Sequence, residues 1–101
     1  MSPDPTPDRA VYGIAVVSEL TGLHPQTLRG YEANDLVAPA RTEGGTRRYS
    51  ANDVAHVQRI TALLAAGLNL TGVKRVIELE EETARLRTEL EKLRERKSPK
   101  S

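Results

Sequence analysis

The sequence predicts a mainly α fold in two parts, a head of short helices with a β-hairpin and a long helix after it. Three observations support this prediction. Two short segments with helical periodicity meet at a break that contains Gly22, and the pair Gly44-Gly45 separates two segments rich in Thr, Arg and Tyr. Leu79, Thr83, Leu86, Leu90 and Leu93 then follow one another at intervals of four, three, four and three residues. Helix, turn, helix and hairpin in this order indicate a winged helix-turn-helix, and the leucine repeat indicates a coiled coil.

The composition is that of a small aliphatic protein. The chain has 101 residues, of which 38% are hydrophobic and 29% charged, and it contains no Cys, Trp or Phe. The core of such a chain is small, and stability usually requires a partner, a metal or disulfides. The absence of Cys excludes disulfides, thiolate metal sites and cysteine nucleophiles. We therefore expect a partner chain to contribute to stability.

Four segments follow from these patterns. We expect a disordered, proline-rich arm over residues 1–10, the head over 11–72, the coiled-coil helix over 73–97 and a disordered tail over 98–101. The N-terminus is acidic where a secretory signal is basic, and the longest uncharged run is too short and too polar to cross a bilayer. These features predict a cytoplasmic protein with no membrane partner.

The second helix of the head carries the first candidate site. It should span about residues 25–34, because Pro25 suits the first position of a helix, and it should bury Leu28 and Tyr31. His24, which precedes it, can either cap the helix or contact a base. The outward face then carries polar residues that include Gln26, Thr27 and Arg29.

The hairpin carries two adjacent arginines. Gly44-Gly45 predicts a two-residue turn, after which Arg47 and Arg48 lie on the second strand. Side chains alternate between the two faces of a strand. One arginine should therefore face outward while the other pairs with an acidic residue such as Glu32 or Asp35, and alternation alone does not say which.

Capping residues delimit the last two helices. Ser50, with Asp53 three residues later, predicts a capping box that opens the third helix, and Gly67 is expected to end it. Asn69 is then expected to cap a last helix that starts near Leu70.

The last helix carries the leucine repeat. Six residues at intervals of 3, 4, 3, 4 and 3 form one face of this helix. We call them the leucine seam: Val76, Leu79, Thr83, Leu86, Leu90 and Leu93. No Pro or Gly interrupts the chain after Val73 as far as Lys97, so this helix should be one long rod that cannot fold back on the head. We therefore expect a homodimer whose contact is formed by Val76, Leu79, Leu86, Leu90 and Leu93. Mixed Glu and Arg flanks permit parallel and antiparallel pairing.

No pattern for catalysis is present. His24 and His56 lie on different predicted elements, without the spacing of an acid–base pair or of a metal site. The glycine pair lacks the Lys-Ser/Thr of a phosphate-binding loop. We predict that the protein is not an enzyme and uses no metal and no cofactor.

The arginines of the head instead indicate binding to double-stranded DNA. Arg29 lies on a polar helix face that can approach base edges in a major groove, and Arg47 and Arg48 can bind phosphates beside it. Tyr31 and Tyr49 are expected to be core rings whose hydroxyl groups reach phosphate. The formal net charge is only +1, so local clusters rather than a global field would attract DNA.

These features favour a sequence-specific regulator, and a repressor in particular, over two alternatives. One alternative is a protein that organises DNA with weak sequence preference. The near-neutral charge argues against it, because non-specific binding depends almost entirely on phosphate neutralisation. The other is an adaptor that binds proteins through its coiled coil.

Several motifs resemble the MerR family of bacterial transcriptional regulators over about residues 12–80. They are TLRGYE in the second helix, Pro39-Ala40-Arg41, and Arg47-Arg48-Tyr49-Ser50 at the end of the hairpin. The resemblance implies a winged helix-turn-helix and a dimer held by an antiparallel coiled coil, bound to an inverted repeat. It also implies DNA contacts from Gln26, Thr27, Arg29, Tyr31, Arg47 and Arg48.

The strings HPQTLR, RTEGGTRRYS and GLNLTGVKRVIELE are most similar to the heat-shock repressor branch of that family. This similarity implies repression of heat-shock operons at the nucleoid, with the chaperone DnaK as a co-repressor.

Three features depart from the family pattern. Ala15 stands where the family usually has a Ser or Thr helix cap, which should destabilise the first helix by about 1 kcal/mol. The absence of Cys excludes the metal- and redox-sensing functions of other members. The usual linker before the dimer helix is also missing, so the last helix should be continuous.

Overall fold

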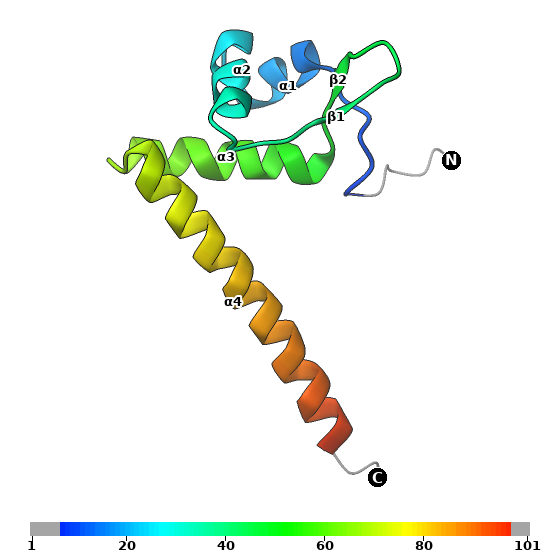
Figure 1. Ribbon diagram of the computed structural model, residues 1–101, viewed down its shortest axis with the longest axis vertical. Coiled ribbons are helices and arrows are strands. Elements are labelled where there is room, and N and C mark those ends of the chain that lie inside the picture. Colours follow the sequence, from blue (N-terminus) through cyan, green and yellow to red (C-terminus); the bar gives the residue numbers. More distant parts are fainter. Residues whose placement is uncertain (1–6, 98–101) are drawn as a thin grey trace. The chain divides into compact units, whose positions relative to one another are not determined.

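The computed structural model describes residues 7–97 and has the predicted mainly α fold (Figure 1). The chain divides into two compact units, one that ends at Ala66 and one that starts at Gly67. The elements in chain order are α1 (Ile14–Thr21), α2 (Pro25–Ala33), β1 (Ala40–Arg41), β2 (Arg47–Arg48), α3 (Ala51–Ala65) and α4 (Leu70–Lys97). None of the helices within residues 7–97 has the length and apolar character needed to cross a membrane.

The core of the first unit lies between its three helices and the hairpin. Helix α1 contacts both α2 and α3. The buried positions of α2 and α3 are apolar at helical spacing, as predicted. In α1 only Val17 is buried, and Leu20, which the periodicity also predicted to face inward, is 53% exposed. The buried residues of this unit are Val17, Leu28, Tyr31, Leu36, Val37, Tyr49, Val57, Ile60 and Leu63. Leu28 and Tyr31 are the buried residues of α2, and its polar face is exposed.

A short turn joins α1 to α2. Gly22 ends α1 in the left-handed region at φ 74°, and its N–H donates to the carbonyl of Ser18 at 2.9 Å. Helix α1 begins one residue earlier than Ala15, with Gly13 at the cap position and no capping side chain. The prediction that Ala15 occupies the cap is therefore wrong, since Ala15 lies within the first turn.

Helix α2 ends with an αL residue that is not glycine. Asp35 has φ 59°, its N–H donates to the carbonyl of Glu32, and the N–H of Leu36 donates to the carbonyl of Tyr31. These two hydrogen bonds form a Schellman motif, in which glycine is the preferred residue at the position of Asp35. Leu36, which follows Asp35, is buried.

The two left-handed positions predict opposite effects on stability. Gly22→Ala should lower the free energy of unfolding by about 1 kcal/mol, because a Cβ disfavours this backbone region. No heavy atom lies within 4 Å of the Cβ that would be added, so the loss is conformational. Asp35→Gly should raise it by about 0.5 kcal/mol for the same reason. Urea unfolding at one fixed protein concentration measures both, and a change of the same sign in the two variants would contradict this account.

The hairpin is antiparallel, with Ala40 opposite Arg48 and Arg41 opposite Arg47. Its turn differs from the predicted two-residue form. The N–H of Gly45 donates to the carbonyl of Thr42, and Gly45 has φ 84°. The loop therefore contains three residues, the last of them left-handed, which is the next most common hairpin connection. We call residues 40–48 the wing.

The arm before α1 pairs with the end of the wing. Tyr12 and Tyr49 form an antiparallel bridge, and the N–H of Tyr49 donates to the carbonyl of Tyr12 at 2.7 Å. The carbonyl of Pro7 accepts from the N–H of Asn52 at 2.8 Å. Disorder was predicted for residues 1–10, but Pro7 is held by this hydrogen bond. The rest of the prediction for the two ends concerns residues 1–6 and 98–101, which lie outside the described residues.

The predicted caps of the last two helices are confirmed. Ser50 and Asp53 form a complete capping box at the start of α3, and the side chain of Asn69 accepts from the N–H of Gly72 at 2.8 Å. Helix α4 starts at Leu70, as predicted, and is a single helix with no internal linker that contains the predicted coiled-coil segment 73–97. Its 28 residues give it a length of about 42 Å.

Candidate nucleic-acid interface

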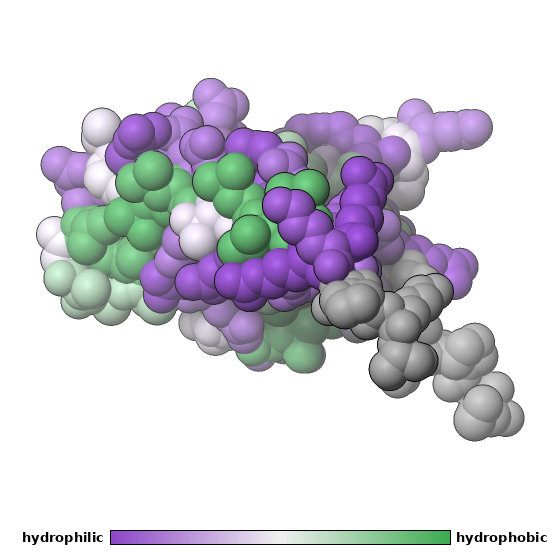
Figure 2. All heavy atoms as spheres, turned by 90° about the horizontal axis from the view of Figure 1, so that it is seen from below, coloured by the Kyte–Doolittle hydropathy of each residue, from purple (hydrophilic) through white to green (hydrophobic). Residues whose placement is uncertain are grey.

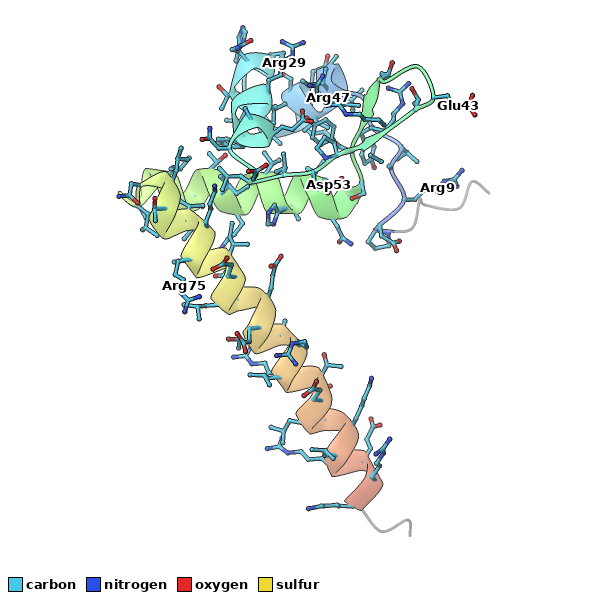
Figure 3. The ribbon with its side chains drawn as sticks, viewed as in Figure 1. Arg9, Arg29, Glu43, Arg47, Asp53 and Arg75 are labelled. Atoms are coloured by element: carbon cyan, nitrogen blue, oxygen red, sulfur yellow. The ribbon has the colours of Figure 1, made fainter. Side chains whose placement is uncertain are left out.

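The exposed face of α2 carries the three polar residues expected there. Gln26, Thr27 and Arg29 are all exposed, whereas Leu28 between them is fully buried. Arg29 projects from α2 on the side away from α3 (Figure 3). No carboxylate within residues 7–97 forms an ion pair with it, so its guanidinium is available to a ligand.

The start of α2 is capped by a histidine. Nδ1 of His24 accepts a hydrogen bond from the N–H of Gln26 at 3.1 Å. His24 therefore acts as the cap, which was one of its two predicted roles. This cap fixes the backbone at the N-terminus of α2. In a recognition helix, the N-terminal residues are the ones that contact base edges.

The two tyrosines are core rings, as predicted, and their contact with DNA stays a prediction. Tyr31 is 7% exposed, and its hydroxyl pairs with the hydroxyl of Thr61 at 3.0 Å. Tyr49 is fully buried, and its hydroxyl has no hydrogen-bond partner in the described part of the chain. Burial raises the pKa of Tyr49 above its ordinary value of 10.0, so the ring stays neutral. The hydroxyl pair of Tyr31 and Thr61 joins α2 to α3.

One carboxylate holds both strands of the wing to α2. Glu32 accepts a hydrogen bond from Nη2 of Arg41 at 2.7 Å and another, through its second oxygen, from Nε of Arg47. The Glu32 side chain is 19% exposed, against 32% for Arg47. We call these three residues the Glu32 cluster.

The choice left open by strand alternation is thereby decided. Arg47 is the arginine paired with Glu32, and Asp35 takes no part in the Glu32 cluster. Nη1 of Arg48 donates to the carbonyl of Arg47 at 3.3 Å, and it lies 3.3 Å from where a Cβ on Gly13 would be. No carboxylate within the described residues pairs with Arg48, so its charge is not neutralised.

Sequence reasoning missed two contacts near this face. Arg41 joins the Glu32 cluster, and the signal for it was its position opposite Arg47 in the hairpin register. His56, for which we predicted no role, contacts the carbonyl of Leu36 through Nε2 at 2.8 Å and so ties α3 to the segment after α2.

The Glu32 cluster predicts a loss of stability in acid. The hydrogen bond from Arg47 lowers the pKa of Glu32 below its ordinary value of 4.5; burial opposes this shift, and the charges of Arg47 and Arg41 add to it. The stabilisation should be complete above pH 4.5 and be lost as the pH falls through the lowered pKa. Urea unfolding at about pH 7 and about pH 3 should show a larger loss in wild type than in Glu32→Gln. Equal losses would contradict this assignment.

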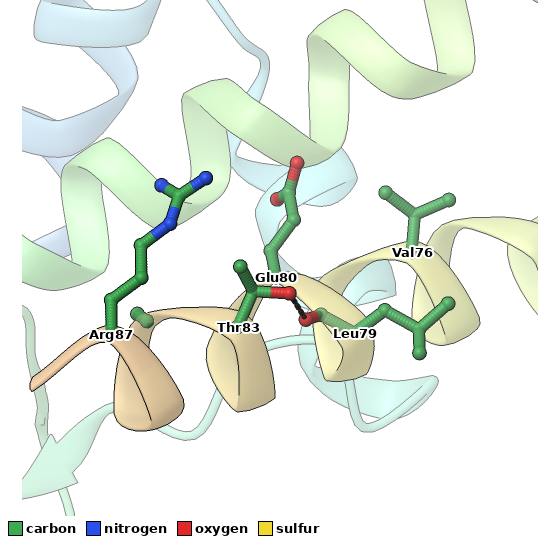
Figure 4. A pocket seen from close by; sticks show the side chains of 6 residues that line it. Val76, Leu79, Glu80, Thr83 and Arg87 are labelled. Atoms are coloured by element: carbon green, nitrogen blue, oxygen red, sulfur yellow. Dashed lines mark hydrogen bonds between the residues drawn. The ribbon is translucent and has the colours of Figure 1, made fainter. Parts of the chain in front are cut away.

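Helix α4 exposes the leucine seam. Leu79, Leu86, Leu90 and Leu93 are 46%, 48%, 46% and 52% exposed. The space-filling view from below shows a band of hydrophobic atoms bordered by hydrophilic ones (Figure 2). A shallow groove of about 410 Å³ follows the N-terminal part of the seam, and the residues that line it all belong to α4 (Figure 4). They are Val76, Leu79, Glu80, Thr83, Ala84 and Arg87.

Comparison with curated proteins identifies several relatives of this chain. Over 82 residues the chain is 50% identical to the heat shock protein HspR of Streptomyces coelicolor, which covers 80% of this chain and 54% of that protein. Over 71 residues it is 41% identical to the HTH-type transcriptional regulator GlnR of Bacillus anthracis, which covers 70% of this chain and 55% of that protein. The chain thus spans about half the length of these relatives.

Solved structures share the fold. HiNmlR, a MerR family regulator lacking the sensor domain and bound to promoter DNA, superposes with a TM-score of 0.63 over 83% of this chain and 76% of that chain, at 24% identity. The transcription regulator PbrR691 from Ralstonia metallidurans, in complex with lead(II), superposes with a TM-score of 0.66 over 83% and 78% of the two chains, at 23% identity. The model of the MerR HTH family of regulatory proteins matches residues 12–80. The chain, with its capped helix-turn-helix, its wing and its long C-terminal helix, belongs to the MerR family of helix-turn-helix regulatory proteins.

Proposed function

We propose that this protein is a sequence-specific DNA-binding transcriptional regulator. The observation that supports this most directly is the exposed face of α2, where Gln26, Thr27 and Arg29 stand clear of the core while His24 caps the helix. An exposed guanidinium on such a helix can bind the O6 and N7 atoms of a guanine in the major groove. Arg48 on the wing supplies a charge for a neighbouring phosphate. No step of this function requires catalysis.

The protein acts as a homodimer in this proposal. The four exposed leucines of α4 present an apolar stripe of the kind that pairs with another helix in a coiled coil. A second copy offers a matching stripe, and two-fold symmetry pairs each seam with the other. The dimer then presents two copies of α2, which suits an inverted repeat with half-sites one helical turn, or a multiple of it, apart.

The similarity to HspR extends the proposal to repression of heat-shock and chaperone genes, at the nucleoid in the cytoplasm. The chaperone DnaK is proposed as co-repressor on the same ground. Addition of purified DnaK should tighten operator binding at least several-fold, and unchanged affinity would remove DnaK from the proposal.

Selection from randomised duplexes tests the central claim. The purified protein should enrich an inverted repeat, and the enriched operator should bind at least 1000-fold more tightly than a random-sequence duplex at about 0.15 M salt. Equal binding to all duplexes would instead indicate a DNA-organising protein. Binding to none would indicate an adaptor that binds proteins through its coiled coil. Either result overturns the proposal.

A further inference from the structure

The Glu32 cluster has a consequence for DNA binding beyond the stability of the wing. Arg41 and Arg47 lie opposite each other on β1 and β2, and the two oxygens of one carboxylate bind them. Arg48 is the remaining arginine of the wing, and no carboxylate within residues 7–97 pairs with it. The wing therefore carries three guanidinium groups, of which two are engaged internally.

We propose that Glu32 is a specificity-determining residue, because it withholds the guanidinium groups of Arg41 and Arg47 from the phosphate backbone. This inference rests on the proposed function, since it requires that the wing lies against DNA. Phosphate contacts add affinity for every duplex and carry no sequence information. A wing with three free arginines would strengthen binding to all sequences, whereas a wing with one leaves discrimination to α2.

The geometry of the Glu32 cluster opposes release of the two arginines, although the Arg41 side chain is 47% exposed. The Glu32 side chain is 19% exposed and binds two cations, so a phosphate must displace a partly buried, doubly hydrogen-bonded carboxylate. The Arg75–Glu78 pair on α4 is a contrast, because its side chains are 69% and 65% exposed. Pairs exposed to that degree form and break readily in water. Glu32 also lies three residues after Arg29 on α2, so the same residue links the wing to the helix that carries Arg29.

Removal of the charge of Glu32 tests the inference. Glu32→Gln keeps the shape of the side chain and releases both arginines. Binding to a random-sequence duplex should tighten about three- to tenfold, and the plot of log affinity against log salt should steepen by about 0.9 for each new phosphate contact, up to about 1.8. Affinity for the selected operator should rise less, so the ratio of specific to non-specific affinity should fall.

Glu43→Gln is the matched control. Glu43 lies in the hairpin loop (Figure 3), and its loss changes the net charge by the same amount. No residue of the described part of the chain forms an ion pair with it. Its salt slope should stay near that of wild type. Equal steepening in Glu43→Gln and Glu32→Gln would mean that net charge alone is responsible, and would overturn the inference.

Two further variants separate this role from simple positioning. Glu32→Asp keeps the charge and should restore a wild-type salt slope. The triple variant Glu32→Gln, Arg41→Gln, Arg47→Gln removes the released cations and should also return to it. Two results would overturn the inference. One is a triple variant that binds random-sequence duplex as tightly as Glu32→Gln does. The other is a Glu32→Gln variant that binds random-sequence duplex more weakly than wild type with an unchanged salt slope. The proposed function has its own test, which is the selection of an operator by the wild-type protein. If the wild-type protein selects no operator, the proposed function is overturned, whatever the variants show.

Discussion

Arg29→Ala should lower affinity for the selected operator about 10- to 100-fold, which corresponds to the roughly 1–3 kcal/mol of a bidentate contact to one base pair. The structure explains why this residue should matter most. Arg29 is exposed on α2, has no ion-pair partner within the described residues, and follows Leu28, whose burial holds the helix in place. Binding to a random-sequence duplex should change little, so the ratio of specific to non-specific affinity should fall with it.

The wing arginines provide the comparison for that result. Arg48→Ala should weaken binding to operator and random duplex alike and flatten the salt slope by about 0.9, as loss of a single phosphate contact requires. Arg47→Ala should have a smaller effect on the slope, because Glu32 already binds its guanidinium. Arg75→Ala removes the same charge from α4, where Arg75 pairs with Glu78, and should be neutral. Unchanged operator affinity in Arg29→Ala would refute the assignment of α2 as the recognition helix.

Leu86→Lys should convert the dimer to a monomer at micromolar concentration. Leu86 is near the middle of the leucine seam and is 48% exposed in the single chain. Burial of a leucine contributes about 1.5–3 kcal/mol, and the substitution acts twice in a symmetric dimer. A lysine in the seam also has to be desolvated. Dimerisation should therefore weaken by at least about 100-fold, and tight operator binding should be lost with it.

Sedimentation equilibrium measures the change, and Thr88→Lys is the control. Thr88 lies two residues further along α4, outside the leucine seam, and is exposed, with its hydroxyl bonded to the carbonyl of Ala84. It should leave the dimer intact. A wild-type chain that sediments as a monomer, or a Leu86→Lys variant that remains a dimer, would contradict pairing through the seam.

Much of the fold could be predicted because the signals are local. Ser50 and Asp53 are three residues apart and determine the start of α3 through hydrogen bonds within one turn. Apolar periodicity placed Leu28 in the core for an equally local reason. The predictions that failed depended on backbone choices of nearly equal energy, such as a three-residue loop that ends at Gly45 instead of a two-residue loop.

The candidate site divides along the same line. The sequence by itself determined that α2 presents Gln26, Thr27 and Arg29 on one polar face, because a helix of this period has a single apolar stripe. Only the tertiary structure decided that Arg47 pairs with Glu32, fifteen residues away, while no carboxylate of residues 7–97 pairs with Arg48. Strand alternation separates two neighbours but does not say which of them faces the helix. That choice depends on how the wing packs against α2, which involves residues far apart in the chain.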